Sequence, residues 1–129
     1  MNDPRSDFLI RIKNAYLARK DSVLIPHSKT KEAIAQVLKR HSFLRGLEIK
    51  SEGVKKILIL DLFYHNKTPK FTDLEIVSKP GKRVYASYHK LPKVLGGWGI
   101  TVVSTPQGMM SDKEARKKML GGEIICKIW

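Results

Sequence analysis

The stretch at residues 56–64 places the strictest demand on the fold. Four aliphatic residues in a row, at 57–60, precede Asp61, and further apolar and aromatic residues follow. Successive side chains of a strand point to opposite faces, so an unbroken apolar run needs cover on both of them. Branched and aromatic residues also favour extended backbone. We therefore expect residues 56–64 to form the central strand of a sheet.

Helix signals precede this strand. Asp3 and Pro4 form a start signal, because aspartate caps a helix and proline suits its first position. The apolar stripe expected in that helix is Phe8, Ile12, Ala15 and Tyr16. Ser28 can cap a second helix, whose expected apolar stripe is Ala33, Ile34, Val37 and Leu38. Short strands are expected at 23–25 and 47–50, so the first half of the chain reads α-β-α-β-β.

Strands dominate the second half of the chain. They are expected at 73–78, 83–87, 99–103 and 123–129, with one helical turn at 89–95. Pro80 and Gly81 form a type II turn signal, and Gly121 and Gly122 are expected to stop a helix. The polar segment 65–70 is the best linker, so we predict an N-terminal α/β domain, 1–66, and a mainly β domain with short helices, 67–129. Each half is small for independent stability, so we expect an α+β fold in which the halves pack on one another.

Charge limits the partners of the chain. It carries 25 lysines and arginines against 12 aspartates and glutamates, a net charge of +13. Residues 76–111 contain no acidic residue, while five basic residues lie among them: Lys79, Lys82, Arg83, Lys90 and Lys93. Tyr85 and Tyr88 lie in the same run and could stack on bases. A domain of this kind favours a polyanion, above all a nucleic acid. The alternative is that Tyr85 packs in the sheet and that the lysines are ordinary solvent-exposed residues without a binding role.

Two further segments suit an anionic partner. Ser104 and Thr105 offer hydroxyls after a strand, Gly108 allows positive φ, and Ser111 with Glu114 has capping-box spacing. We expect a small, rigid, hydroxyl-bearing loop pinned by a helix, with a capped surface turn as the alternative. Lys29 and Lys31 lie in the first turn of the second helix, where free N–H groups could join them in an anion site or where they could be merely solvated.

Signs of catalysis are weak. The only cysteine, Cys126, lies in an apolar run and is expected to be buried, and the four histidines lack metal-ligand spacing. No phosphate loop or dinucleotide loop is present. No apolar run approaches the ~20 residues of a membrane helix, and no targeting segment is visible. We therefore expect no catalytic residue, metal, cofactor, small-molecule substrate or membrane contact; an enzyme that uses Cys126 is the third hypothesis.

Ordered motifs along nearly the whole chain resemble a known family. They begin with Asp3 and Pro4, the spaced residues at 11–15 and the lysines at 29 and 31. They continue with VSKPGKRVY at 77–85, LPKV at 91–94, Gly99 and Ile100, the residues between 104 and 116, and GGE at 121–123. Together these motifs resemble the bacterial type of the eighth protein of the small ribosomal subunit.

The resemblance implies a primary binder of small-subunit ribosomal RNA that contacts a helix of the central domain and aids assembly of the platform. It implies a cytoplasmic ribosome as location, neighbouring small-subunit ribosomal proteins as partners, and repression through binding of its own messenger RNA. The contact residues that it implies are Ser104, Thr105, Gly108, Tyr85, Lys82, Arg83, Glu123, Lys29 and Lys31. Pro106 stands where serine is common, so one hydroxyl and one N–H are missing. The alternative hypothesis is a basic DNA-binding or chromatin-like module.

Overall fold

The computed structural model describes residues 3–129, which divide into two compact units. One unit is Pro4–Phe71, and the other is Thr72–Trp129 together with Asp3. Both contain helices and antiparallel sheets, so the expected α+β class is confirmed.

A three-stranded antiparallel sheet forms the framework of the first unit. Its strands are β1 (Ser22–Pro26), β2 (Gly46–Glu52) and β3 (Lys55–Asp61), in the order β1-β3-β2. The prediction of a central strand is therefore confirmed, although this strand ends at residue 61 rather than 64. Leu58 and Leu60 of β3 are fully buried.

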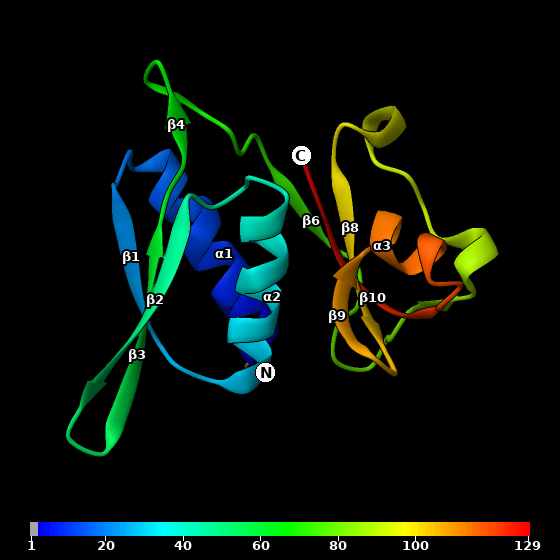
Figure 1. Cartoon of the computed structure of the whole chain (residues 1–129), viewed down its shortest axis with the longest axis horizontal. Helices are drawn as coiled ribbons and strands as arrows, with labels where there is room; N and C mark the ends of the chain where they lie inside the picture. The colour runs from blue at the N-terminus through cyan, green and yellow to red at the C-terminus, as the bar shows by residue number, and fades with distance from the viewer. Residues whose placement is uncertain (1–2) are drawn as a thin grey trace. The chain divides into compact units, whose positions relative to one another are not determined.

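Two helices, α1 (Pro4–Leu17) and α2 (Lys29–Arg40), lie along one face of this sheet (Figure 1). The Ser28 hydroxyl accepts a hydrogen bond from the Lys31 N–H at 3.1 Å, which confirms the expected cap. The stripe predicted for α1 is buried, and Leu9 joins it. In α2, Ala35 is buried whereas Ala33 is half-buried. Helical spacing puts these two residues at similar angles on either side of the stripe, so packing and not the period decides between them.

Tyr16 joins α1 to two loops of the same unit. Its hydroxyl donates to the Phe43 carbonyl at 2.5 Å and accepts from the Phe63 N–H at 3.0 Å. Its ring stacks on Phe71 with the centroids 4.8 Å apart. Burial raises the pKa of Tyr16 to about 12, because the charged phenolate would be poorly solvated.

The segment expected as a linker contains a short hairpin. Its strands are β4 (Tyr64–His65) and β5 (Thr68–Pro69), and Asn66 and Lys67 at its tip have φ values of 49° and 66°. Positive φ at both central residues is typical of a two-residue hairpin turn. The first unit continues beyond this hairpin to Phe71.

A five-stranded antiparallel sheet forms the framework of the second unit. Its strands are β6 (Leu74–Ile76), β7 (Tyr85–Ala86), β8 (Ile100–Thr105), β9 (Gly108–Ser111) and β10 (Gly122–Ile128). They follow the order β6-β10-β8-β9, and β7 pairs with β10 on the same edge as β6. The type II turn signal is consistent with a φ of 81° at Gly81 and a bridge between Lys79 and Lys82.

The strand predicted at 83–87 is shorter than expected. This strand does not pair with β6, because both backbone groups of Val84 bond elsewhere. The Ser78 hydroxyl accepts from the Val84 N–H at 3.0 Å, and the Val84 carbonyl accepts from the Ile124 N–H at 2.8 Å. The single helical turn predicted at 89–95 was also wrong. Two 3₁₀ turns, η1 (Tyr88–Lys90) and η2 (Leu95–Gly97), flank an extended segment instead, since the Pro92 ring disfavours helical backbone before it.

The third helix, α3 (Asp112–Lys117), begins with the expected capping box. The Ser111 hydroxyl accepts from the Glu114 N–H at 3.1 Å, and the Glu114 carboxylate accepts from the Ser111 N–H at 3.0 Å. The buried Asp112 carboxylate accepts from the Thr101 N–H at 3.0 Å and pairs with Arg116. These contacts attach the start of the helix firmly to β8.

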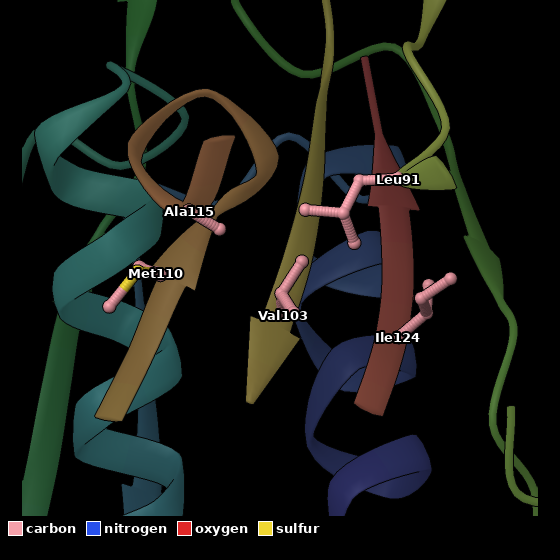
Figure 2. Packing of buried hydrophobic residues seen from close by; sticks show 5 residues of the cluster. All are labelled: Leu91, Val103, Met110, Ala115 and Ile124. Carbon is pink, nitrogen blue, oxygen red and sulfur yellow. The ribbon is translucent and has the colours of Figure 1, made fainter. Parts of the chain in front are cut away.

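One face of this sheet is buried against α3. Figure 2 shows Val103, Met110 and Ile124 on the neighbouring strands β8, β9 and β10, together with Leu91 and with Ala115 of α3. All five are at most 6% exposed. This cluster fixes which side chains of the three strands point inward.

A bulge interrupts β10. Val103 pairs with Ile124 but Val102 pairs with Cys126, so Ile125 has no partner on β8. The Ile125 carbonyl instead accepts from the Val77 N–H at 3.0 Å. The extra residue changes the alternation of side chains along β10, as a bulge does.

Candidate functional site

Four side chains form a row across one end of the second sheet, here called the cross-strand row. Tyr85 on β7 pairs with Glu123 on β10, Glu123 pairs with Ser104 on β8, and Ser104 pairs with Met109 on β9. Paired residues of antiparallel strands point to the same face of a sheet. The row therefore lies on the face opposite the Val103 cluster, and it brings three of the predicted site residues together.

The row is open to a partner at the end that Tyr85 occupies. Tyr85 is 69% exposed, so the alternative in which it packs in the sheet is wrong. Ser104, Met109 and Glu123 are half-buried. A flat ring thus stands beside a carboxylate and a hydroxyl on a rigid sheet.

The loop predicted after residue 103 is smaller than expected. Ser104 and Thr105 belong to β8, and Gly108 begins β9, so the loop consists of Pro106 and Gln107 alone. The prediction of a strand end at 103 was wrong because pairing with β9 extends the ladder. The expected positive φ at Gly108 is confirmed, at 113°.

Thr105 holds this turn together. It is 8% exposed, and its hydroxyl donates to the Gly108 carbonyl at 2.8 Å and accepts from the Gln107 N–H at 3.1 Å. Both bonds stay within the hairpin. Thr105 is therefore suited to shaping the loop, whereas Ser104 lies on the cross-strand row itself.

Gly122 lets β10 approach β8 closely at the row. A Cβ atom on Gly122 would lie 2.0 Å from the Ser104 carbonyl oxygen and 3.1 Å from the Thr105 Cα. The expectation that Gly121 and Gly122 stop the helix was wrong, since α3 already ends at Lys117 and Met119 carries the positive φ, 57°. Gly122 is required here for its small size.

Cations flank the cross-strand row. A guanidinium nitrogen of Arg83 lies 3.6 Å from a carboxylate oxygen of Glu123, so the charge of this carboxylate is partly balanced. Lys82 is exposed on the turn before Arg83. The surroundings of the row therefore stay cationic despite Glu123.

The two lysines predicted in the first half lie elsewhere. Lys29 and Lys31 are in the first turn of α2, in the unit Pro4–Phe71, whereas all other predicted contact residues are in the second unit. Glu32 in the same turn pairs with His27 at 2.7 Å, which adds an acidic group beside them. The assignment of these lysines as contacts stays a prediction.

Sequence reasoning missed two residues that build this site. Met109 completes the row opposite Ser104, and Gly122 sets the spacing of the strands. The register of β8 and β9 was the missing information for Met109, because residues 104–108 read as a loop. For Gly122, the neighbouring pair of glycines was the available signal, but it suggested a helix end.

The described residues offer little for other chemistry. Cys126 is fully buried, as expected. Within residues 3–129 no three side chains of His, Cys, Asp or Glu gather closely enough to hold a metal ion. No helix in this part of the chain is both long and apolar enough to cross a bilayer.

The arrangement suits a ligand that combines flat bases, hydroxyls and phosphates. An exposed tyrosine can stack on a base or sugar, a serine hydroxyl and a carboxylate can bond to 2′-hydroxyls, and lysine and arginine bind phosphates. An RNA helix presents these groups in its shallow minor groove. The rigid sheet end with its two-residue loop can reach such a groove.

Comparisons with known proteins identify the family of the chain. Residues 3–129 match the family model described as Ribosomal protein S8. The chain is 50% identical over 130 residues to "Small ribosomal subunit protein uS8" of Caldanaerobacter subterraneus subsp. tengcongensis, and 48% identical over 131 residues to the protein of the same name from Thermosynechococcus vestitus. It is 45% identical over 129 residues to that of Pelagibacter ubique. In each case the match covers 100% of this chain and 98% of the relative. The chain therefore belongs to the ribosomal protein S8 family.

Proposed function

We propose that this chain is a structural component of the small ribosomal subunit that binds ribosomal RNA directly through the cross-strand row. The relatives that share its whole length are named as small-subunit proteins. The observation that carries the RNA-binding role is the row itself, Tyr85–Glu123–Ser104, flanked by Arg83 and Lys82. The ligand would be an irregular helix of the central domain of the small-subunit RNA.

Each group of the row has a distinct task in this proposal. Tyr85, the most exposed member, stacks on a base or ribose. Ser104 bonds to a 2′-hydroxyl or base edge, and Glu123 accepts from a 2′-hydroxyl while Arg83 limits its repulsion of phosphates. Gly108 lets the loop backbone approach the groove, and Thr105 keeps that loop in shape.

Alanine variants of the row test the proposal. Tyr85→Ala removes a stacking platform worth about 1–3 kcal/mol, so the Kd for a central-domain RNA transcript should rise roughly 5- to 150-fold. Ser104→Ala removes one hydrogen bond of about 0.5–1.5 kcal/mol and should raise the Kd roughly 2- to 12-fold. Binding is measured by filter retention or fluorescence anisotropy.

Matched controls separate direct contacts from loss of folding. Ser51 is exposed on β2 of the other unit, so Ser51→Ala should leave the Kd unchanged. Tyr85→Ala should keep the wild-type Tm, because the side chain is mostly exposed. Unaltered affinity in both row variants would refute the assignment of the row.

Four finer expectations extend the proposal. With about 6 phosphate contacts, raising the salt from ~50 to ~200 mM should weaken binding about a thousandfold. Excess duplex DNA should not displace the chain from the transcript, whereas a general basic DNA-binding module would be displaced. A stem of its own messenger RNA should compete with the transcript, and platform assembly should lag without the chain.

A further inference from the structure

A second surface stands at the far end of β8. The turn η2 leads into the start of β8 (Figure 1). The cross-strand row crosses β8 near its other end, at Ser104. Ser104 follows Trp98 by six positions, which corresponds to roughly 20 Å of extended backbone. A partner at η2 would therefore not compete with RNA on the row.

Two large apolar side chains are exposed on this turn. Trp98 is 88% exposed and Leu95 is 61% exposed. The Trp98 N–H donates to the Leu95 carbonyl at 3.2 Å, so the two residues lie close together on one turn. A single exposed apolar residue is ordinary, but an adjacent tryptophan and leucine form a compact apolar knob.

The backbone of the knob is held in an unusual conformation. Leu95, Gly96 and Gly97 have φ values of 47°, 62° and 101°, and a branched residue rarely adopts positive φ. The Val94 carbonyl accepts from both Gly97 and Gly99, and the Lys113 ammonium donates to the Gly97 carbonyl. A strained turn that is fixed from several sides presents its side chains in one preset position, which favours a functional role.

The charges around the knob are positive. Lys93 is exposed just before the turn, and Lys113 lies beside Gly97. The acids of the adjacent helix are engaged internally: Asp112 with Thr101 and Arg116, and Glu114 in the capping box. The complementary surface is an apolar pocket bordered by carboxylates.

The geometry points to a protein partner: we propose that Trp98 and Leu95 insert into an apolar, acid-rimmed pocket on a neighbouring protein of the small subunit. The aliphatic Leu95 adds nothing to base stacking but fills an apolar pocket beside Trp98. Tryptophan is also the residue most enriched among the side chains that dominate protein interfaces. This inference rests on the proposed ribosomal role and adds a second binding site to it.

Titration of purified small-subunit proteins, one at a time, against the fluorescently labelled chain tests this site. One of them should bind, and Trp98→Ser should weaken that binding about 30-fold or more. Leu95→Gly, which tolerates the positive φ, should weaken it as well, and Lys93→Glu should weaken it most at low salt. Val54→Ser is the matched control, since Val54 is a fully exposed apolar residue on the β2–β3 turn.

RNA binding by the same variants separates the two sites. Trp98→Ser should bind the central-domain transcript like the wild type, whereas Tyr85→Ala should bind it poorly and bind the protein partner normally. Loss of transcript binding in Trp98→Ser would assign Trp98 to RNA and overturn the proposal. The proposal is also overturned if no small-subunit protein binds, or if binding is indifferent to Trp98. Failure of Tyr85→Ala to affect the transcript would instead count against the row alone.

Discussion

Replacing Gly122 by alanine is the most direct probe of how the second sheet builds its site. The new Cβ would lie 2.0 Å from the Ser104 carbonyl oxygen and 2.8 Å from the Ser104 carbonyl carbon. Both atoms are backbone, so no side-chain rotation can relieve the clash. Strands β8 and β10 must separate by about 1 Å, because real Cβ contacts shorter than 3.0 Å essentially never occur.

The cost can be worked from two contributions. Forcing an extra carbon into a packed site costs about 1–3 kcal/mol, and stretching a ladder hydrogen bond beside it adds about 1 kcal/mol. The free energy of unfolding should therefore fall by about 2–4 kcal/mol. For a chain of 129 residues that unfolds in one step, this corresponds to a fall in Tm of roughly 8–16 °C.

Calorimetry and RNA titration together provide the assay. Gly46→Ala is the control, because its Cβ would meet only the Asp61 carboxylate, at 3.5 Å, and alanine has less backbone entropy to lose in a strand. Below its Tm, Gly122→Ala should also bind the transcript more weakly, since Ser104 is displaced from the row. If Gly122→Ala melts like the wild type, the close approach of β10 and β8 described above is incorrect.

Three further perturbations follow from other contacts. Ser111→Ala removes the hydroxyl of the capping box and should lower the unfolding free energy by about 1 kcal/mol in urea titrations, an effect absent in Ser111→Thr. Asp112→Ala leaves the half-buried Arg116 and the Thr101 N–H without their carboxylate acceptor, so it should cost about 1.5–3 kcal/mol, and equal stability in urea would contradict the ion pair. Tyr16 has a folded-state pKa raised from 10.0 to about 12, so its contribution to stability is complete below pH 10 and is lost as the pH rises toward 12. The stability of Tyr16→Phe should therefore fall less than that of the wild type between pH 10 and 12. Identical profiles of unfolding free energy against pH would argue against the buried phenol.

Local signals in the sequence predicted most elements because each depends on neighbouring residues. The caps at Ser28 and Ser111 involve partners three residues away, and the central strand was recognisable from its own apolar run. Charge and the ordered motifs indicated the kind of partner. These features require no knowledge of distant pairing.

Features that depend on distant pairing could not be predicted in the same way. Ser104 and Thr105 are strand residues because they pair with β9. The strand expected at 83–87 is shorter than predicted because the Ser78 hydroxyl accepts from the Val84 N–H. The cross-strand row requires the register of four strands at once. The role of Gly122 likewise depends on a carbonyl from another strand.

The bulge at Ile125 serves the edge of β10 that faces away from β8. Ile124 and Cys126 already pair with Val103 and Val102, which are neighbours on β8, so deleting Ile125 would leave that ladder regular and Ile124 on its present face. The deletion would instead remove the carbonyl that accepts from the Val77 N–H, where the chain leaves β6. A chain shortened by this one residue should therefore keep the pairing of β8 with β10 and lose an attachment of the segment that leads from β6 to Tyr85.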